Sequence, residues 1–207
     1  MQGNQLIAIN VNQSDFDKLM TAYMQAKNTL ENILITLKGE AKEFYGYDII
    51  NTVTSRLKTP QSIFDKLKRK HYEVNCNNMI KYIDDIAGVR VVCPFKTNIK
   101  LIRNILSEIP NINILKEKDY IKKPKRSGYS GYHLIVEVPV VLQEETIYVK
   151  AEIQIRTMAM DFWATTEHKI RYKSVNKISI FDSFKLSVYA KLLNKIDNQL
   201  IKIKNKK

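Results

Sequence analysis

Two acidic residues stand beside segments whose composition is typical of buried strands, where a carboxylate is rare unless it has a partner. Asp85 precedes the apolar run 86–92, and Glu152 lies inside the run 149–155. Strand alternation puts a cation, a carboxylate, an amide and a second cation on one face, namely Lys150, Glu152, Gln154 and Arg156. Such a row suits a solvated sheet face and a magnesium-phosphate site equally well, because Mg²⁺ takes one or two carboxylates together with phosphate oxygens.

Basic residues precede and enter a predicted helix. Arg56 and Lys58 share a face of a short predicted strand, while Lys66 and Arg69 lie three residues apart on the helix that follows. Together they have the charge to hold a triphosphate, although Lys and Arg on helices most often face solvent. The sequence contains no glycine-rich Walker loop, which excludes the P-loop route to phosphate binding.

The stretch 122–133 is basic and contains glycines and tyrosines before a predicted strand. Its lysines can contact phosphate, its glycines let a backbone approach a ligand closely, and Tyr129 can stack on a base. A basic surface loop or a general RNA contact explains the same residues, and a lone histidine such as His133 at the start of a strand is usually structural. The stretch therefore predicts a phosphate-binding or base-binding loop without choosing its ligand.

The elements that must position these groups follow from hydrophobic periodicity. Helical spacing predicts an N-terminal helix over 14–38, with Ser14 as its N-cap and Gly39 as its stop, and a C-terminal helix over 178–205. Between them, residues 46–173 form the expected catalytic core, with strands over 49–58, 89–95, 112–115, 133–141 and 147–156 and helices over 60–72, 97–109 and 158–172. The last two strands are predicted to form an antiparallel hairpin around the turn 143–145, and residues 116–131 to form a mobile functional loop. We therefore expect an α+β fold, a mixed sheet flanked by helices with extra helices at both ends.

Composition bounds the class of protein. The chain has 207 residues, a formal net charge of +13 and 44% hydrophobic residues, so we expect one folded domain over 1–207 that binds an anionic partner. No apolar run approaches the roughly 20 residues of a spanning helix, and the N-terminus lacks the features of an export signal. We therefore expect a cytoplasmic protein with no membrane partner. Cys76 and Cys93 are too few and too isolated for a zinc site.

Taken together, the motifs resemble the synthetase domain of the RelA/SpoT family. The resemblance is carried by the series around Arg56, Lys58, Pro60 and Lys66, by Asp85-Ile86-Ala87-Gly88-Val89-Arg90, by Ser127-Gly128-Tyr129 with Tyr132-His133, and by Glu152-Ile153-Gln154-Ile155-Arg156-Thr157 followed by Phe162-Trp163-Ala164-Thr165 and Glu167-His168-Lys169. It covers about residues 15 to 200 in family order, and the length matches the single-domain members, the small alarmone synthetases.

The resemblance implies a nucleotidyltransferase-like fold and transfer of pyrophosphate from ATP to the ribose 3′-hydroxyl of GDP or GTP, with GMP as a further acceptor to test. The products would be guanosine alarmones of the stringent response. Asp85 and Glu152 would be the catalytic pair and the ligands of Mg²⁺, with Glu152 also orienting or deprotonating the hydroxyl. The implied ATP-binding residues are Arg56, Lys58, Lys66, Arg69 and Arg90. The implied acceptor-binding residues are Lys125, Tyr129, His133, Gln154 and Glu167. Ser127 stands where many relatives have Asn, and Asp161 stands where some have Asn, so neither the preferred acceptor nor an allosteric nucleotide site is predicted.

Partners and alternatives remain open on the sequence. The apolar stripe from Ile180 to Ile203 predicts an interface, and small members of the family are typically homotetramers, although the stripe could also pack wholly on its own domain. Single-stranded RNA is a candidate regulator that the basic loop would contact. One alternative function is that of a toxic-type relative that pyrophosphorylates tRNA 3′ ends or adenosine nucleotides. Another is a non-catalytic RNA-binding module, which Asp85 and Glu152 disfavour because carboxylates facing RNA phosphate add nothing to binding.

Overall fold

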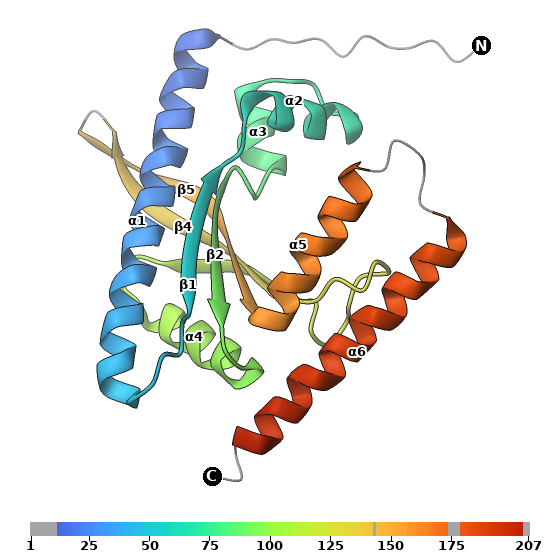
Figure 1. Ribbon diagram of the computed structural model, residues 1–207. Coiled ribbons are helices and arrows are strands. Elements are labelled where there is room, and N and C mark those ends of the chain that lie inside the picture. The colour runs from blue at the N-terminus through green and yellow to red at the C-terminus, as the bar shows by residue number, and fades with distance from the viewer. Residues whose placement is uncertain (1–11, 143, 174–178, 205–207) are drawn as a thin grey trace.

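The computed structural model describes residues 12–142, 144–173 and 179–204 (Figure 1). In chain order its elements are α1 (Gln13–Tyr45), β1 (Thr52–Leu57), α2 (Pro60–Arg69), α3 (Cys76–Tyr82), β2 (Ala87–Cys93), α4 (Lys96–Glu108), β3 (Asn113–Asp119), β4 (Tyr132–Leu142), β5 (Glu145–Thr157), α5 (Met158–Lys173) and α6 (Ile180–Lys204). Side-chain caps explain where two of the helices begin. The Thr59 hydroxyl accepts a hydrogen bond from the Ser62 amide with Pro60 in the first turn, and Asn75 caps α3 in the same way.

The strands of the described residues form one mixed sheet in the order β1-β2-β5-β4-β3. β2 and β5 run parallel, whereas the pairs β1–β2, β5–β4 and β4–β3 are antiparallel. The register sets Gly88 opposite both Arg56 of β1 and Glu152 of β5, and it sets His133 of β4 opposite Gln154. Because residues in register share a face of the sheet, strand pairing alone brings these side chains to one surface.

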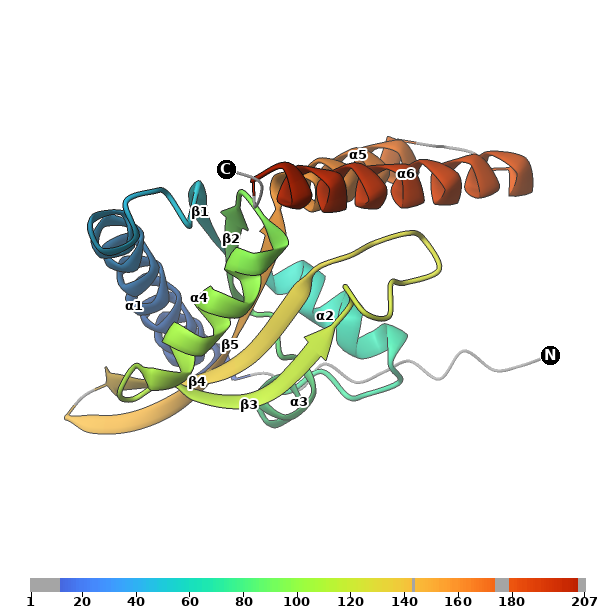
Figure 2. The ribbon, with the colours of Figure 1, turned by 90° about the horizontal axis from the view of Figure 1, so that it is seen from below.

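The opposite face of the sheet carries the hydrophobic core. Val91 of β2, Leu134 of β4 and Ile153 of β5 are fully buried there, and α1 and α4 pack against this face (Figures 1 and 2). Burying each such side chain contributes about 1.5–3 kcal/mol. A register slip of one residue would expose all of them, so the core also determines which residues the other face presents.

The fold class, the mixed sheet and the hairpin of β4 and β5 are confirmed, although Gln143 of the predicted turn lies outside the described residues. The predicted limits of the first helix are wrong. α1 is capped by Asn12 instead of Ser14, and it continues through Gly39 to Gly46, which has a left-handed φ of 70°. Packing of the buried Leu37 and Ala41 outweighs the roughly 1 kcal/mol that a mid-helix glycine costs.

Two further differences lie between the terminal helices. The short, polar α3 has no apolar periodicity and was not predicted. β3 extends to Asp119, so residues 116–119 belong to a strand and not to the predicted mobile loop. Pairing with β4, in which Lys118 stands opposite His133, explains this extension because each residue added gains ladder hydrogen bonds.

α6 packs on the rest of the chain with only part of its apolar surface. Leu186 and Ala190 are buried with Trp163 of α5, and Figure 2 shows the two helices running side by side. The side chains that define the predicted stripe are exposed: Ile180, Phe184, Val188, Leu192, Ile196, Leu200 and Ile203. The stripe is therefore not covered by the described part of its own domain, and the predicted helix ends 178 and 205 lie outside that part. Neither α6 nor another described helix is long and apolar enough to cross a membrane.

Candidate active site

The polar face of the sheet gathers the row of side chains that strand alternation predicts. β5 presents Glu152, Gln154 and Arg156, and β2 presents Arg90 in register with Gln154. Glu152 is 8% exposed and Arg156 is 6% exposed, so this is not the solvated sheet face that alternation left open. Buried charges persist only when they are paired or hydrogen-bonded, and the partners of these residues define the site.

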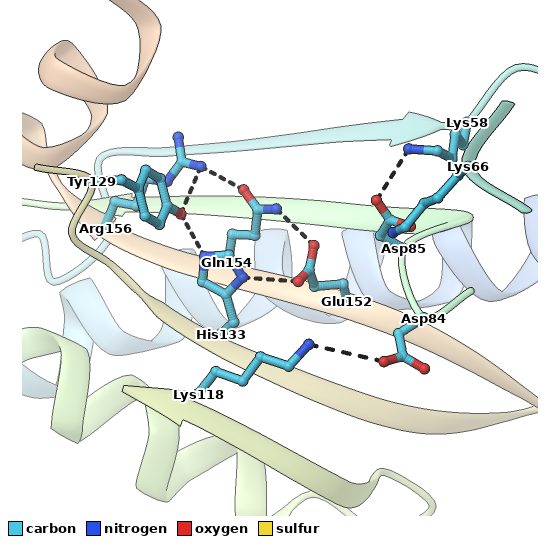
Figure 3. Close-up of polar contacts among 10 residues, drawn as sticks. All are labelled: Lys58, Lys66, Asp84, Asp85, Lys118, Tyr129, His133, Glu152, Gln154 and Arg156. Carbon is cyan, nitrogen blue, oxygen red and sulfur yellow. Dashed lines mark hydrogen bonds and ion pairs between the residues drawn. The ribbon is translucent and has the colours of Figure 1, made fainter. Parts of the chain in front are cut away.

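Asp85 lies in the segment that leads into β2 and binds lysines from two other parts of the chain (Figure 3). Its Oδ1 lies 2.6 Å from Lys66 Nζ of α2, and its Oδ2 lies 3.1 Å from Lys58 Nζ just after β1. Burial by itself raises the pKa of Asp85, but the hydrogen bonds and charges of the two lysines outweigh it and lower the pKa below its ordinary value. Asp85 is therefore ionised at neutral pH.

Glu152 is held by hydrogen bonds at both carboxylate oxygens. His133 Nδ1 lies 2.8 Å from Oε1, and Gln154 Nε2 donates to Oε2 at 2.7 Å. Burial raises the pKa of Glu152, but the hydrogen bond and charge of His133 and the hydrogen bond of Gln154 lower it below its ordinary value. Since an ionised Glu152 can only accept, His133 donates from Nδ1 to Oε1, and its Nε2 hydrogen-bonds to the Tyr129 hydroxyl.

Arg156 connects this carboxylate to the loop between β3 and β4. Its Nη2 donates to the Tyr129 hydroxyl at 2.9 Å and to Gln154 Oε1 at 2.7 Å. A hydrogen-bond chain thus runs from Arg156 through Tyr129 and His133 to Glu152 (Figure 3). The chain orients Glu152 and fixes the position of the Tyr129 ring at the same time.

The loop is packed in place by its aromatic residues and by a glycine. Lys125 Nζ lies 4.6 Å from the ring centre of Tyr120 and 4.8 Å from that of Tyr129. Gly128 has a φ of 82°, and a Cβ atom there would lie 2.4 Å from the Cβ of Ala190 on α6. Only glycine fits such a position. The loop is therefore seated on α6 and is not a free basic surface loop.

Two neighbouring hollows open on the polar face. The first is lined by Asp85 and Glu152. The second lies between the loop and α5 and is lined by Tyr129 and Glu167. Polar residues that line both are Arg56, Arg90 and Gln154. The arrangement suits a phosphate chain beside two carboxylates and a flat base beside an aromatic ring, in adjoining parts of one cleft.

The predicted site residues come together with one exception. Arg69 is exposed at the end of α2 and lines neither of the two hollows. Three residues outside the predicted set also belong to the site, namely Tyr120, Arg156 and Asp161. Alternation had already placed Arg156 on the site face. Tyr120 and Asp161 carry no such signal, because loop and helix packing bring them in.

Asp85 and Glu152 suit a metal ion only when phosphate oxygens of a bound nucleotide complete its coordination shell. Among the described residues, no group of three or more His, Cys, Asp or Glu side chains comes together as a metal site. Asp85 and Glu152 nevertheless supply what Mg²⁺ prefers, since it takes one or two protein carboxylates and completes its shell with phosphate oxygens and water. The donor set therefore suits magnesium that arrives with a nucleotide.

Sequence comparison finds relatives over nearly the whole chain. The family model described as "Region found in RelA / SpoT proteins" matches residues 55–177. GTP pyrophosphokinase YwaC of Bacillus subtilis is 40% identical over 190 residues, which are 92% of this chain and 90% of that protein. GTP pyrophosphokinase YjbM of the same organism is 31% identical over 198 residues, covering 94% of this chain and 90% of that protein.

Solved structures agree with the fold. The small alarmone synthetase 1 of Bacillus subtilis bound to its product pppGpp superimposes with a TM-score of 0.85 at 30% identity, covering 94% of this chain and 98% of that one. The small alarmone synthetase 2 of the same organism has a TM-score of 0.83 at 38% identity, covering 93% of this chain and 100% of that one. The expected mixed-sheet fold with helices at both ends is therefore that of its structural neighbours.

Proposed function

This chain belongs to the RelA/SpoT family, and we propose that it transfers pyrophosphate from ATP to the ribose 3′-hydroxyl of GDP or GTP, making guanosine alarmones. The observation that carries this proposal is the pair Asp85 and Glu152 in one hollow, beside cations for a triphosphate and next to an aromatic ring for a base. The GTP pyrophosphokinases among its relatives support the reaction class, since they align with 92% and 94% of this chain.

On the donor side, the two lysines that pair with Asp85 can also bind ATP. Lys58 and Lys66 each have three ammonium protons, so they can turn toward phosphate oxygens while they stay near Asp85. Arg56 and Arg90 suit adenine stacking or phosphate bridging, because a guanidinium is planar and donates in pairs. Arg69 remains a proposed ATP contact, although it lines neither hollow.

On the acceptor side, Tyr129 stacks on guanine, and Lys125, His133, Gln154 and Glu167 surround the nucleotide. Glu152 accepts the proton of the 3′-hydroxyl as the oxygen attacks the β-phosphorus of ATP, and AMP leaves with the electron pair of the broken bond. A depressed pKa keeps Glu152 ionised at neutral pH, and the hydrogen bonds from His133 and Gln154 aim its oxygens. Phosphoryl chemistry depends mainly on such positioning and charge neutralisation.

Magnesium is the cofactor that we propose, held by Asp85 with support from Glu152. Bound there, it would neutralise charge on the phosphates during transfer. The Lys58 and Lys66 ion pairs keep Asp85 deprotonated and ready to bind a cation. Removing the metal with EDTA should abolish transfer, and added MgCl₂ should restore it.

The deciding experiment incubates the protein with ATP labelled at the β- or γ-phosphate, MgCl₂ and one acceptor at a time: GMP, GDP, GTP or tRNA. We expect label on GDP or GTP. Label on tRNA or on adenosine nucleotides instead would favour the toxic-type alternative, and RNA binding without any transfer would favour a non-catalytic module. Asp85→Asn should lower transfer by at least ~10²-fold with the fold retained, while Asp65→Asn, an exposed change on α2, should not.

The proposal also includes the oligomeric state of the protein and its location in the cell. We propose that the N-terminal helix, the core and α6 act as a single synthetase domain that forms a homotetramer in the cytoplasm through the exposed stripe of α6. Leu192 and Ile196 lie in the middle of that stripe and are 55% and 47% exposed. Single-stranded RNA added to the transfer assay tests whether the basic loop also serves regulation.

A further inference from the structure

A further acidic side chain of the site, Asp161, pairs with arginines, whereas Asp85 pairs with lysines. Asp161 lies in the first turn of α5. Its Oδ1 is 3.1 Å from Arg156 Nη1 and 3.4 Å from Arg90 Nη1. A single carboxylate oxygen is thus shared between guanidinium groups that come from two different strands.

The two arginines need this shared partner. Arg90 is partly buried, and burial, followed by the charges of Arg156 and Arg56, lowers its pKa, while Asp161 acts in the opposite direction. An arginine does not lose its proton in a protein, so the repulsion has to be balanced by an anion. The Nε atoms of Arg90 and Arg156 are buried and have no hydrogen-bond partner among the described residues. Asp161 holds both groups at their Nη1 ends, and Tyr129 and Gln154 hold Arg156 at Nη2.

The two arginines reach different parts of the cleft. Arg90 lines both hollows, including the one that contains the catalytic acids. Arg156 does not line that hollow, but it lines the second one, where it donates to the Tyr129 hydroxyl and to Gln154. Asp161 therefore makes an ionic contact that joins Arg156 of the proposed acceptor side to Arg90, which also lines the proposed donor side.

We propose that Asp161 is a positioning residue that couples ATP binding to acceptor binding. A phosphate oxygen that binds Arg90 competes with Asp161 for its guanidinium, so the Asp161 oxygen then pairs more fully with Arg156. A more firmly held Arg156 fixes Tyr129 and Gln154 in the arrangement that receives guanine. By linkage the effect is reciprocal, so the acceptor strengthens ATP binding by the same factor. This inference rests on the proposed function and adds a residue that orders its two sites.

The test is calorimetric titration of GDP into the full chain with and without a saturating non-hydrolysable ATP analogue, with MgCl₂ present. In the wild type we expect the analogue to tighten GDP binding by about 5-fold or more, the lower end of measured couplings. In Asp161→Asn the ratio should fall to within about 2-fold of one. Asp161→Glu restores the charge and should recover part of the ratio. The matched control is Asp48→Asn. It removes the exposed ion pair between Asp48 Oδ2 and Lys42 Nζ, which lie 3.4 Å apart, and should keep the wild-type ratio.

A structural role for Asp161 predicts a different pattern. It would lower the melting temperature of Asp161→Asn and weaken each nucleotide alone, and it would leave the ratio unchanged. A ratio near one in the wild type, or an unchanged ratio in Asp161→Asn, overturns the coupling even if the wild type transfers label to GDP. A wild type that transfers no label overturns the proposed function instead, and the coupling with it.

Discussion

Replacing Glu152 by glutamine removes the charge and keeps the shape, so it separates catalysis from packing. The carboxylate accepts from His133 and from Gln154, whereas a glutamine has one acceptor oxygen. Rotating the Gln154 amide by 180° would place its NH₂ group next to the Arg156 guanidinium, so two donors would face each other where Arg156 now donates to Gln154 Oε1. The cheaper arrangement keeps the new oxygen on Gln154 and turns the new NH₂ toward His133, which then accepts at Nδ1 and donates from Nε2 to the Tyr129 hydroxyl.

The two effects of this change have different magnitudes. Two charge-assisted hydrogen bonds become neutral ones at a cost of about 1 kcal/mol each, and part of that cost is offset because a buried charge no longer has to be desolvated. We expect a loss of about 1–2 kcal/mol, or a melting temperature lower by roughly 2–8 °C for a chain of this size. The transfer rate should fall much further, by at least ~10²-fold, because the group that accepts the hydroxyl proton is gone.

Label transfer from ATP to GDP, measured beside thermal melting, checks both numbers. The control is Glu108→Gln at the exposed end of α4, which should change neither. Turnover of a folded Glu152→Gln protein near the wild-type rate would refute the assignment of Glu152 as the proton acceptor. A fall in melting temperature well beyond 8 °C would refute the proposed rearrangement of His133.

Four further outcomes follow from the site and from α6. Tyr129→Ala should weaken GDP by roughly 1–3 kcal/mol, the value of one stacked base, and weaken ATP less; equal losses for both nucleotides, or the same loss in the exposed control Tyr148→Ala, would place Tyr129 outside the acceptor site. Gly128→Ala should impair GDP binding, because its φ of 82° is strained for alanine and its Cβ meets Ala190, and adding Ala190→Gly should recover only the steric part; normal GDP titration of the single variant would contradict this packing. The lowered pKa of Asp85 implies stability that is present above the ordinary pKa of about 3.9 and is lost as pH falls through the lower folded value, so the urea-unfolding difference between wild type and Asp85→Asn should shrink below about pH 4, and a constant difference would contradict the ion pairs. Light scattering at micromolar concentration should give a tetramer for the wild type and a smaller species for Leu192→Asp with Ile196→Asp; a wild-type mass near 24.1 kDa, or an intact tetramer in the double variant, would rule out this interface.

Local patterns predicted most elements and much of the site row. The helix predicted over 60–72 begins at Pro60, where Thr59 caps it, and period-two alternation placed Glu152, Gln154 and Arg156 on one face. These signals hold because they depend on neighbours within a few residues, where backbone geometry dictates the outcome. The Gly39 stop failed for the opposite reason, since buried packing on both sides of it outweighs a local propensity.

Which charge meets which partner was decided by the tertiary structure. The sequence alone determined that Asp85, Glu152 and a set of cations are present. It also determined that alternate residues of the strand around Glu152 share one face of the sheet. The parallel pairing of β2 with β5 sets Arg90 beside Gln154. The first turn of α5 puts Asp161 between Arg90 and Arg156. The packing of Gly128 on α6 positions the loop in which the Tyr129 hydroxyl contacts His133. Such contacts join residues far apart in the chain, and their energies depend on long-range packing that no spacing within one segment encodes.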